Sequence, residues 1–145
     1  MRSQLWRLLI VLSVSSQLSC QTGQAIAPPA SEPVPVTVSN RSASPGETLP
    51  AAEVSGGAGT IAFHVKREGF CAAVDARLSR EPNDLALIGH ITPEPADCPT
   101  PPPRPVIEYE GTIRVKEPGD YRVRIFDADD GGTPHLIEST VVTVS

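Results

Sequence analysis

The chain has 145 residues, including 16 prolines and 11 glycines, and a formal net charge of −5 at pH 7. This length is enough for one domain after any targeting segment is removed. No window shows the sustained 3.6-residue apolar period of an amphipathic helix, which excludes a helical bundle and favours an all-β fold rich in loops. The acidic charge argues against nucleic acid as a partner.

The N-terminus has the pattern of an export signal. Arg2 and Arg7 are followed by the apolar run Leu8–Val14, and small and polar residues then lead to Cys20. The apolar run is too short to span a bilayer and has the proportions of a secretory signal. We therefore predict a signal peptide over residues 1–19. Its removal leaves ten basic and seventeen acidic residues, a formal net charge of −7.

Two processing sites compete at the end of this signal. Leu18-Ser19-Cys20 resembles a bacterial lipobox, in which the cysteine becomes the lipidated first residue of a lipoprotein, although Gln17 stands where an aliphatic residue is usual. The other site is Ala25-Ile26-Ala27, which Pro28 follows directly. We favour lipidation of Cys20, which predicts an exported protein anchored in the membrane of the bacterial cell envelope. Cleavage after Ala27 would instead give a soluble secreted or periplasmic protein.

A Gln-, Ala- and Pro-rich stretch follows, and we predict a disordered tether over residues 20–35. The folded domain is then expected over residues 36–145. The first strand is predicted at Val34–Val38, where Pro35 confines it to a sheet edge or to the first strand position. Another strand is predicted over Leu49–Val54.

Three segments in the middle of the chain alternate between apolar and polar side chains, as half-buried strands do. Gly59–Arg67 is the first, and His64 on its polar face is expected to be solvated. Ala72–Ser79 and Leu85–Thr92 follow and should form a hairpin around a turn at Glu81–Asp84. Both faces of Leu85–Thr92 are fairly apolar.

The segment 93–105 contains seven prolines around Cys98, so it cannot be a helix or a central strand, and a polyproline-II-like loop is predicted. If Cys20 carries a lipid, Cys71 and Cys98 remain as an even pair in an oxidising compartment, which predicts a disulfide. The alternative is a pair of reactive or metal-binding thiols. The two cysteines are not in a C-x-x-C, however, and have no histidine at ligand spacing.

The clearest alternation runs over residues 106–128, in two runs joined by Glu117-Pro118-Gly119-Asp120. We predict an antiparallel hairpin in which Tyr109 and Ile125 lie on paired neighbouring strands. Tyr121 follows the Pro-Gly turn and resembles the tyrosine corner of immunoglobulin-like domains.

A closing strand over Leu136–Val144 completes the count of predicted elements. Short strands at hairpin-like spacing, together with the tyrosine at 121, predict the fold class. We expect an all-β, immunoglobulin-like antiparallel β-sandwich of about seven strands, preceded by a signal peptide and a disordered tether.

Cys71 and Cys98 bracket a predicted hairpin, and Tyr109-x-Gly111-Thr112-Ile113 and Pro118-Gly119-x-Tyr121 follow them. In these features Ile61–Val144 resembles a class of small uncharacterised bacterial lipoproteins and secreted proteins. The resemblance implies an immunoglobulin-like sandwich with one disulfide, and it implies no known activity.

Residue types with catalytic chemistry are present without the setting that catalysis needs. The chain lacks a G-x-S-x-G motif, and the Gly-rich segment 56–60 lacks the lysine and the spacing of a phosphate-binding loop. We therefore predict no enzymatic activity and no cofactor. Asp127, Asp129 and Glu138 are candidate calcium ligands, because hard oxygen ligands gather there near Gly131-Gly132. The EF-hand pattern is absent, and acidic residues before Gly-Gly are also typical of hairpin turns.

These observations predict a non-enzymatic structural or protein-interaction module of the cell envelope, with the membrane as one partner through its lipid and an envelope protein as another. The alternative is a small-ligand or calcium-binding accessory domain.

Overall fold

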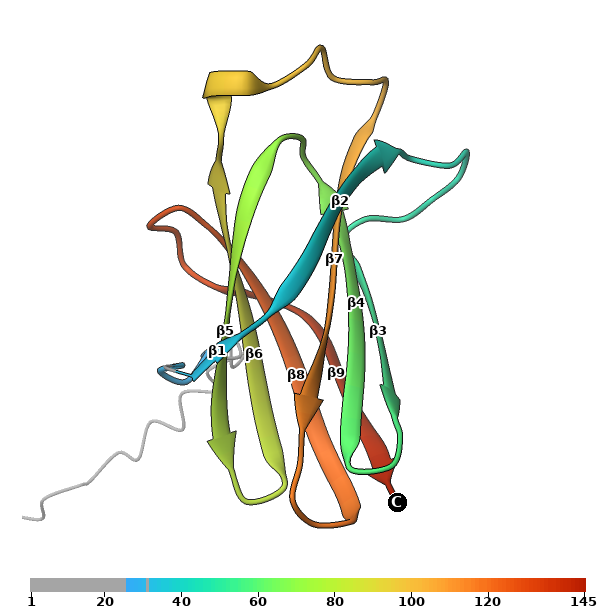
Figure 1. The fold of residues 1–145 in the computed structure, drawn as a ribbon, viewed down its shortest axis with the longest axis vertical. Helices are drawn as coiled ribbons and strands as arrows, with labels where there is room; N and C mark the ends of the chain where they lie inside the picture. The colour runs from blue at the N-terminus through green and yellow to red at the C-terminus, as the bar shows by residue number, and fades with distance from the viewer. Residues whose placement is uncertain (1–25, 31) are drawn as a thin grey trace, which may run out of the picture.

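The domain consists of two β-sheets packed face to face (Figure 1). The computed structural model describes residues 26–30 and 32–145, so the predicted signal peptide and Cys20 lie outside the described residues. Sheet A has the strand order β1-β5-β6-β8-β9, and sheet B has the order β2-β7-β4-β3. The elements are β1 Glu32–Val34, β2 Val36–Ser42, β3 Ala51–Gly56, β4 Thr60–Glu68, β5 Ala72–Glu81, β6 Asp84–Pro93, the 3₁₀ turn η1 Pro95–Asp97, β7 Pro105–Arg114, β8 Gly119–Asp129 and β9 His135–Val144.

The core lies between the sheets and is made of the inward side chains of alternating strands. The prediction of an all-β sandwich is confirmed, and the inward residues expected on β4 are all buried. Burial of each large aliphatic side chain contributes about 1.5–3 kcal/mol, and this core is mainly aliphatic. The buried residues with the largest side chains include Ile61, Phe63, Val65, Leu85, Leu87, Ile107, Tyr109, Ile113, Val123 and Ile125.

The predicted hairpin over residues 72–92 is confirmed. β5 pairs with β6 so that Glu81 lies opposite Asp84, which leaves Pro82-Asn83 as a two-residue turn. Asn83 has a φ of 57°, a conformation that asparagine tolerates better than most residues. From β6 the Pro-rich segment crosses one end of the sandwich to β7 (Figure 1).

The second predicted hairpin, over residues 106–128, is wrong. β7 lies between β2 and β4 in sheet B, whereas β8 lies between β6 and β9 in sheet A, so Tyr109 and Ile125 are not on paired strands. Apolar and polar side chains alternate along both strands because each strand buries one face. This two-residue period is the same whether two strands pair side by side or face each other across a core. The connection 115–118 therefore joins the two sheets.

Sheet A contains one parallel pair. Leu85 lies opposite Val123 and Leu87 opposite Ile125 as β6 and β8 run in the same direction, while the other strand pairs are antiparallel. β7 returns along sheet B between them, so the chain enters β8 from the end at which β6 began (Figure 1). The sandwich thus has nine strands in its described ranges, two more than the seven expected, and is not antiparallel throughout.

Tyr121 stabilises the connection between β7 of sheet B and β8 of sheet A. Its side chain is 8% exposed, and its Oη donates a hydrogen bond of 2.8 Å to the carbonyl oxygen of Glu117, four residues earlier. A tyrosine at the start of a strand that bonds back to the preceding backbone is the tyrosine corner of immunoglobulin-like sandwiches. The bond from Tyr121 to Glu117 is of this kind.

β1 lies inside the segment that the sequence assigned to the tether. Glu32–Val34 pairs with β5, and Val34 is buried against the core. After Pro35 the chain passes directly into β2 of the other sheet (Figure 1). Proline is tolerated here because β1 and β2 are both edge strands. The described strands therefore begin before residue 36, and the strand predicted over Val34–Val38 is divided at Pro35 between the edge strands of the two sheets.

The opposite edge of the sandwich is closed by backbone contacts between β9 and the β3–β4 turn. Gly59 N donates to Ser145 O at 3.0 Å, and Ser145 N donates to Gly57 O at 3.2 Å. A Cβ on Gly56 would lie 2.0 Å from the carbonyl oxygen of Thr143, so a side chain there would force the two sheets apart.

The outer face of sheet A carries a second apolar cluster, which we call the outer apolar cluster. It consists of Ala86, Ile88 and Phe126, all buried, and Ala27 and Ala30 pack against it. This explains the two apolar faces of β6, because one faces the core and the other is covered by the stretch that precedes β1.

Replacement of the two tyrosines by phenylalanine should have opposite effects on stability. Tyr121→Phe loses the bond to Glu117 and should lower the free energy of unfolding by about 1 kcal/mol. Tyr109 Oη is buried and has no hydrogen-bond partner in the described part of the chain. Tyr109→Phe should therefore raise the free energy of unfolding by about 1 kcal/mol. Urea unfolding measures both values, and equal losses in the two variants would contradict these assignments.

Candidate functional site

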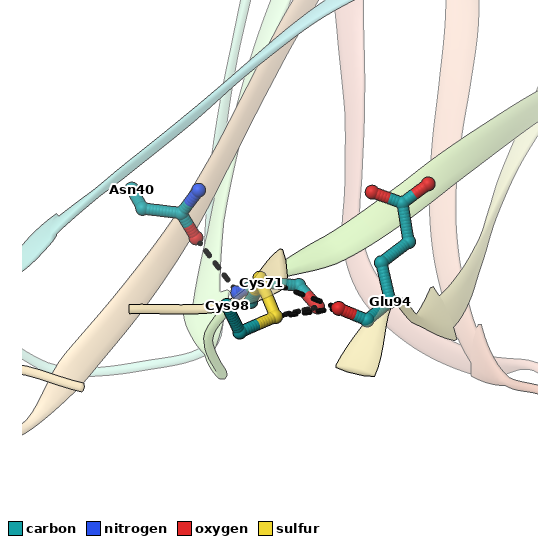
Figure 2. Close-up of a disulfide and its surroundings, with 4 residues drawn as sticks. All are labelled: Asn40, Cys71, Glu94 and Cys98. Carbon is teal, nitrogen blue, oxygen red and sulfur yellow. Dashed lines mark hydrogen bonds between the residues drawn. A yellow bond between two sulfur atoms is a disulfide. The ribbon is translucent and has the colours of Figure 1, made fainter. Parts of the chain in front are cut away.

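Cys71 and Cys98 form a disulfide, as predicted, with their Cα atoms 5.8 Å apart (Figure 2). Cys71 precedes β5 and Cys98 follows η1, so the bond closes the segment that contains the β5–β6 hairpin. Asn40 Oδ1 accepts a hydrogen bond of 3.2 Å from Cys71 N, and Glu94 N donates to Cys71 O at 2.9 Å. The disulfide and these bonds tie one end of sheet A to β2 of sheet B, which is a structural role.

The three candidate calcium ligands do not converge on one point. Arg67 from β4 contacts Asp127 Oδ2 at 3.1 Å and Asp129 Oδ1 at 2.9 Å. Glu138 lies on β9 opposite Ile125, and its carboxylate accepts a hydrogen bond from the next backbone N–H. Over residues 26–30 and 32–145 no group of three or more His, Cys, Asp or Glu side chains is placed to hold a metal ion. The structure brings Asp127 and Asp129 together around a guanidinium.

Arg67, Asp127, Asp129 and Tyr109 make an inter-sheet polar cluster at one end of the core. Desolvation raises the pKa of the Asp127 carboxyl, while the positive charge of Arg67 acts in the opposite direction. Burial also raises the pKa of the Tyr109 hydroxyl, and the charge of Asp127 adds to this effect. A Cβ on Gly89 would lie 2.3 Å from Tyr109 Oη, so the absence of a side chain at Gly89 makes room for the hydroxyl.

Sequence reasoning missed Arg67, although a signal was present. Arg67 continues the inward series Ile61, Phe63 and Val65 on β4, and Asp127 continues the inward series of β8. A charged side chain at an inward position needs a partner, because an unpaired buried charge is costly. The inward positions of Arg67 and Asp127 on different strands therefore predict an ion pair between them.

The exposed large apolar side chains gather on or beside one surface, which we call the sheet A outer face. Leu136 and Val141 of β9 are 42% and 62% exposed and lie opposite Phe126 and Arg122. Ile26 is 86% exposed and adjoins Ala27, which packs on this face. These three are the exposed large hydrophobic residues of the described chain. The sheet A outer face comprises Asp75, Arg77, Asp84, Ala86, Ile88, Arg122, Arg124, Phe126, Leu136 and Val141, and its three arginines pair with the two aspartates.

The outer face of sheet B is polar and slightly hollowed. One row across its four strands consists of Thr37, Glu110, His64 and Glu53. His64 is partly exposed on this polar face, as predicted, with Nε2 3.8 Å from a carboxylate oxygen of Glu108. We call this surface the sheet B hollow, and it is lined by Thr37, Glu53, Ser55, Ala62, His64, Glu110 and Thr112.

Removal of the disulfide should weaken the fold strongly. The pair Cys71→Ala and Cys98→Ala should lower the free energy of unfolding by about 3–4 kcal/mol, because the bond spans 27 residues and restricts the unfolded chain. Urea unfolding without reductant measures the loss. Cys20→Ala keeps the disulfide and serves as the control. A loss below about 1 kcal/mol in the double variant would contradict the role assigned to this bond.

Arg67→Met should destabilise the protein more at pH 7 than at pH 4. The raised pKa of Asp127 means that the folded state holds this proton more tightly than the unfolded state, so stability from Asp127 increases as pH falls through its folded-state pKa. Without Arg67 the ionised carboxylate has lost its partner, and we expect a loss of about 1–2 kcal/mol at pH 7.

The matched control is Arg77→Met, which removes an exposed pair with Asp75 on β5. It should change stability by less than about 0.5 kcal/mol at either pH. Urea unfolding at both pH values measures the two variants. Equal effects of Arg67→Met at pH 7 and pH 4 would show that the ionised Asp127 does not depend on Arg67.

The comparisons with known proteins identify no relative of this chain. No protein-family model, curated protein or solved structure matches the chain. In the part of the chain that the structure describes, no helix is long and apolar enough to cross a membrane.

Proposed function

We propose that this protein is an exported lipoprotein of the bacterial cell envelope, anchored through Cys20, and that its sandwich is a non-enzymatic structural or protein-interaction module. The observation that carries the proposal is the packing of Ala27 on the outer apolar cluster. Cleavage after Ala27 would remove a residue that covers Phe126 and its neighbours. Processing at Cys20 keeps the whole covering stretch, which favours the lipobox over the competing site.

The ion pairs of the sandwich support a role in binding or structure. Arg41 contacts the carboxylates of Glu47 and Glu108, and Lys66 contacts Glu53 at 2.9 Å. These charges neutralise one another along the strands of sheet B, as they do in the inter-sheet polar cluster. Groups that are already paired in this way stabilise a surface, whereas catalysis needs titratable groups aimed at a common reacting atom.

The sheet B hollow is the surface that we assign to a protein partner. It presents the carboxylate of Glu110 beside His64, with hydroxyl groups around them, while the carboxylate of Glu53 is paired with Lys66. Acidic side chains on a shallow surface favour a basic segment of the partner, and the formal charge of −7 after residue 19 acts in the same direction over longer distances. Complementary charge of this kind contributes mainly to association rate and specificity.

The test begins with the N-terminus of the protein expressed in a bacterial envelope. Mass spectrometry of the mature chain should find acyl groups on Cys20, and Cys20→Ala should leave the protein in the soluble fraction. A mature chain that begins at Pro28 without acyl groups would overturn the anchored form.

The same cells test the partner surface. A photo-crosslinking residue in place of Thr112, in the sheet B hollow, should capture the same envelope protein repeatedly. Glu53→Lys with Glu110→Lys should abolish that product by reversing the charge of the hollow. Arg77→Glu on the opposite sheet is the matched control. Capture that survives the double reversal would overturn the assignment of this surface.

A further inference from the structure

The stretch that leads from the predicted anchor meets the fold on the sheet A outer face. Ala27 and Ala30 pack there on Ile88 and Phe126. Cys20 precedes Ile26 by six residues, and a fully extended chain of that length reaches at most about 20 Å. A lipid on Cys20 therefore holds this face near the bilayer surface. The sheet B hollow lies on the other side of both sheets and is correspondingly farther away.

The chemistry of this face suits the interface between water and lipid. Leu136 and Val141 expose apolar side chains, and Ile26 adds a third at the edge of the covering stretch. Arg122 lies opposite Val141 on the neighbouring strand with 61% of its side chain exposed, and its guanidinium is 3.8 Å from the carboxylate of Asp84. Apolar side chains enter the boundary of the acyl chains, while long arginine side chains reach the headgroup phosphates.

We infer that the sheet A outer face is a lipid-contacting surface that lies against the phospholipid bilayer, with Leu136 and Val141 at the acyl boundary. The inference rests on the proposed anchor at Cys20 for bringing this face to the membrane. It assigns the two faces of the sandwich to different partners, because the sheet B hollow is then turned away from the bilayer toward a protein.

A single tryptophan on either face tests the orientation. Trp6 is the only tryptophan of the chain, and it lies in the predicted signal peptide, so residues 20–145 contain none. Val141→Trp places one on the sheet A outer face, and Ala62→Trp places one in the sheet B hollow as the matched control. Residues 20–145, which include every strand that the structure describes, are coupled through the thiol of Cys20 to a maleimide phospholipid in vesicles of phosphatidylcholine and phosphatidylglycerol.

Brominated phosphatidylcholine in the same vesicles then quenches any tryptophan that enters the lipid. We expect Val141→Trp to be quenched at least about twofold more strongly than Ala62→Trp. Equal quenching of the two variants, or stronger quenching of Ala62→Trp, would overturn the inference. Circular dichroism and cooperative unfolding first confirm that each variant is folded.

Two further outcomes are distinguishable. A concentration-dependent dimer of the uncoupled chain, with the Val141→Trp emission shifted to the blue in the absence of lipid, would assign this face to a second copy and overturn lipid contact. The coupling supplies the lipid chemically, so the result does not depend on acylation by the cell. Failure to find acyl groups on Cys20 in cells would overturn the proposed function and would leave the quenching result intact.

Discussion

Burial of one face of every strand against the opposite sheet is the interaction on which this domain depends. The inward side chains are mostly valine, isoleucine and leucine, so the core is small and its register matters. A slip of one residue in β8 would place Arg122 and Arg124 in the core and expose Val123 and Ile125. The disulfide lies at one end of this core and the Tyr121–Glu117 hydrogen bond at the other.

The sequence predicted which side chains are buried better than it predicted which strands pair. Alternation placed Ile61, Phe63, Val65, Tyr121 and Val123 inward correctly, because the period of two follows from the backbone itself. It could not show that β7 and β8 lie in different sheets. A Pro-Gly turn reverses the chain in a hairpin and in an arch between sheets alike, and the choice depends on partners that are distant in sequence.

The sequence did not predict the short strand β1 or the inter-sheet polar cluster, for related reasons. β1 has three residues, too few to show a period, and it is ordered only because β5 supplies a neighbour. Arg67 and Asp127 are 60 positions apart, and their contact exists only once two strands from different sheets have been aligned. The disulfide was predictable because an even pair of cysteines remains once Cys20 is set aside, and the predicted export signal implies an oxidising compartment.

The stretch that covers the outer apolar cluster also determines how a mechanical load would enter the domain. A pull on the N-terminus is carried first by the few contacts of Ala27 and Ala30, and then by the three-residue strand β1. Both can detach while β5, β6 and β8 keep their longer ladders. The N-terminal end should therefore detach before the central strands do.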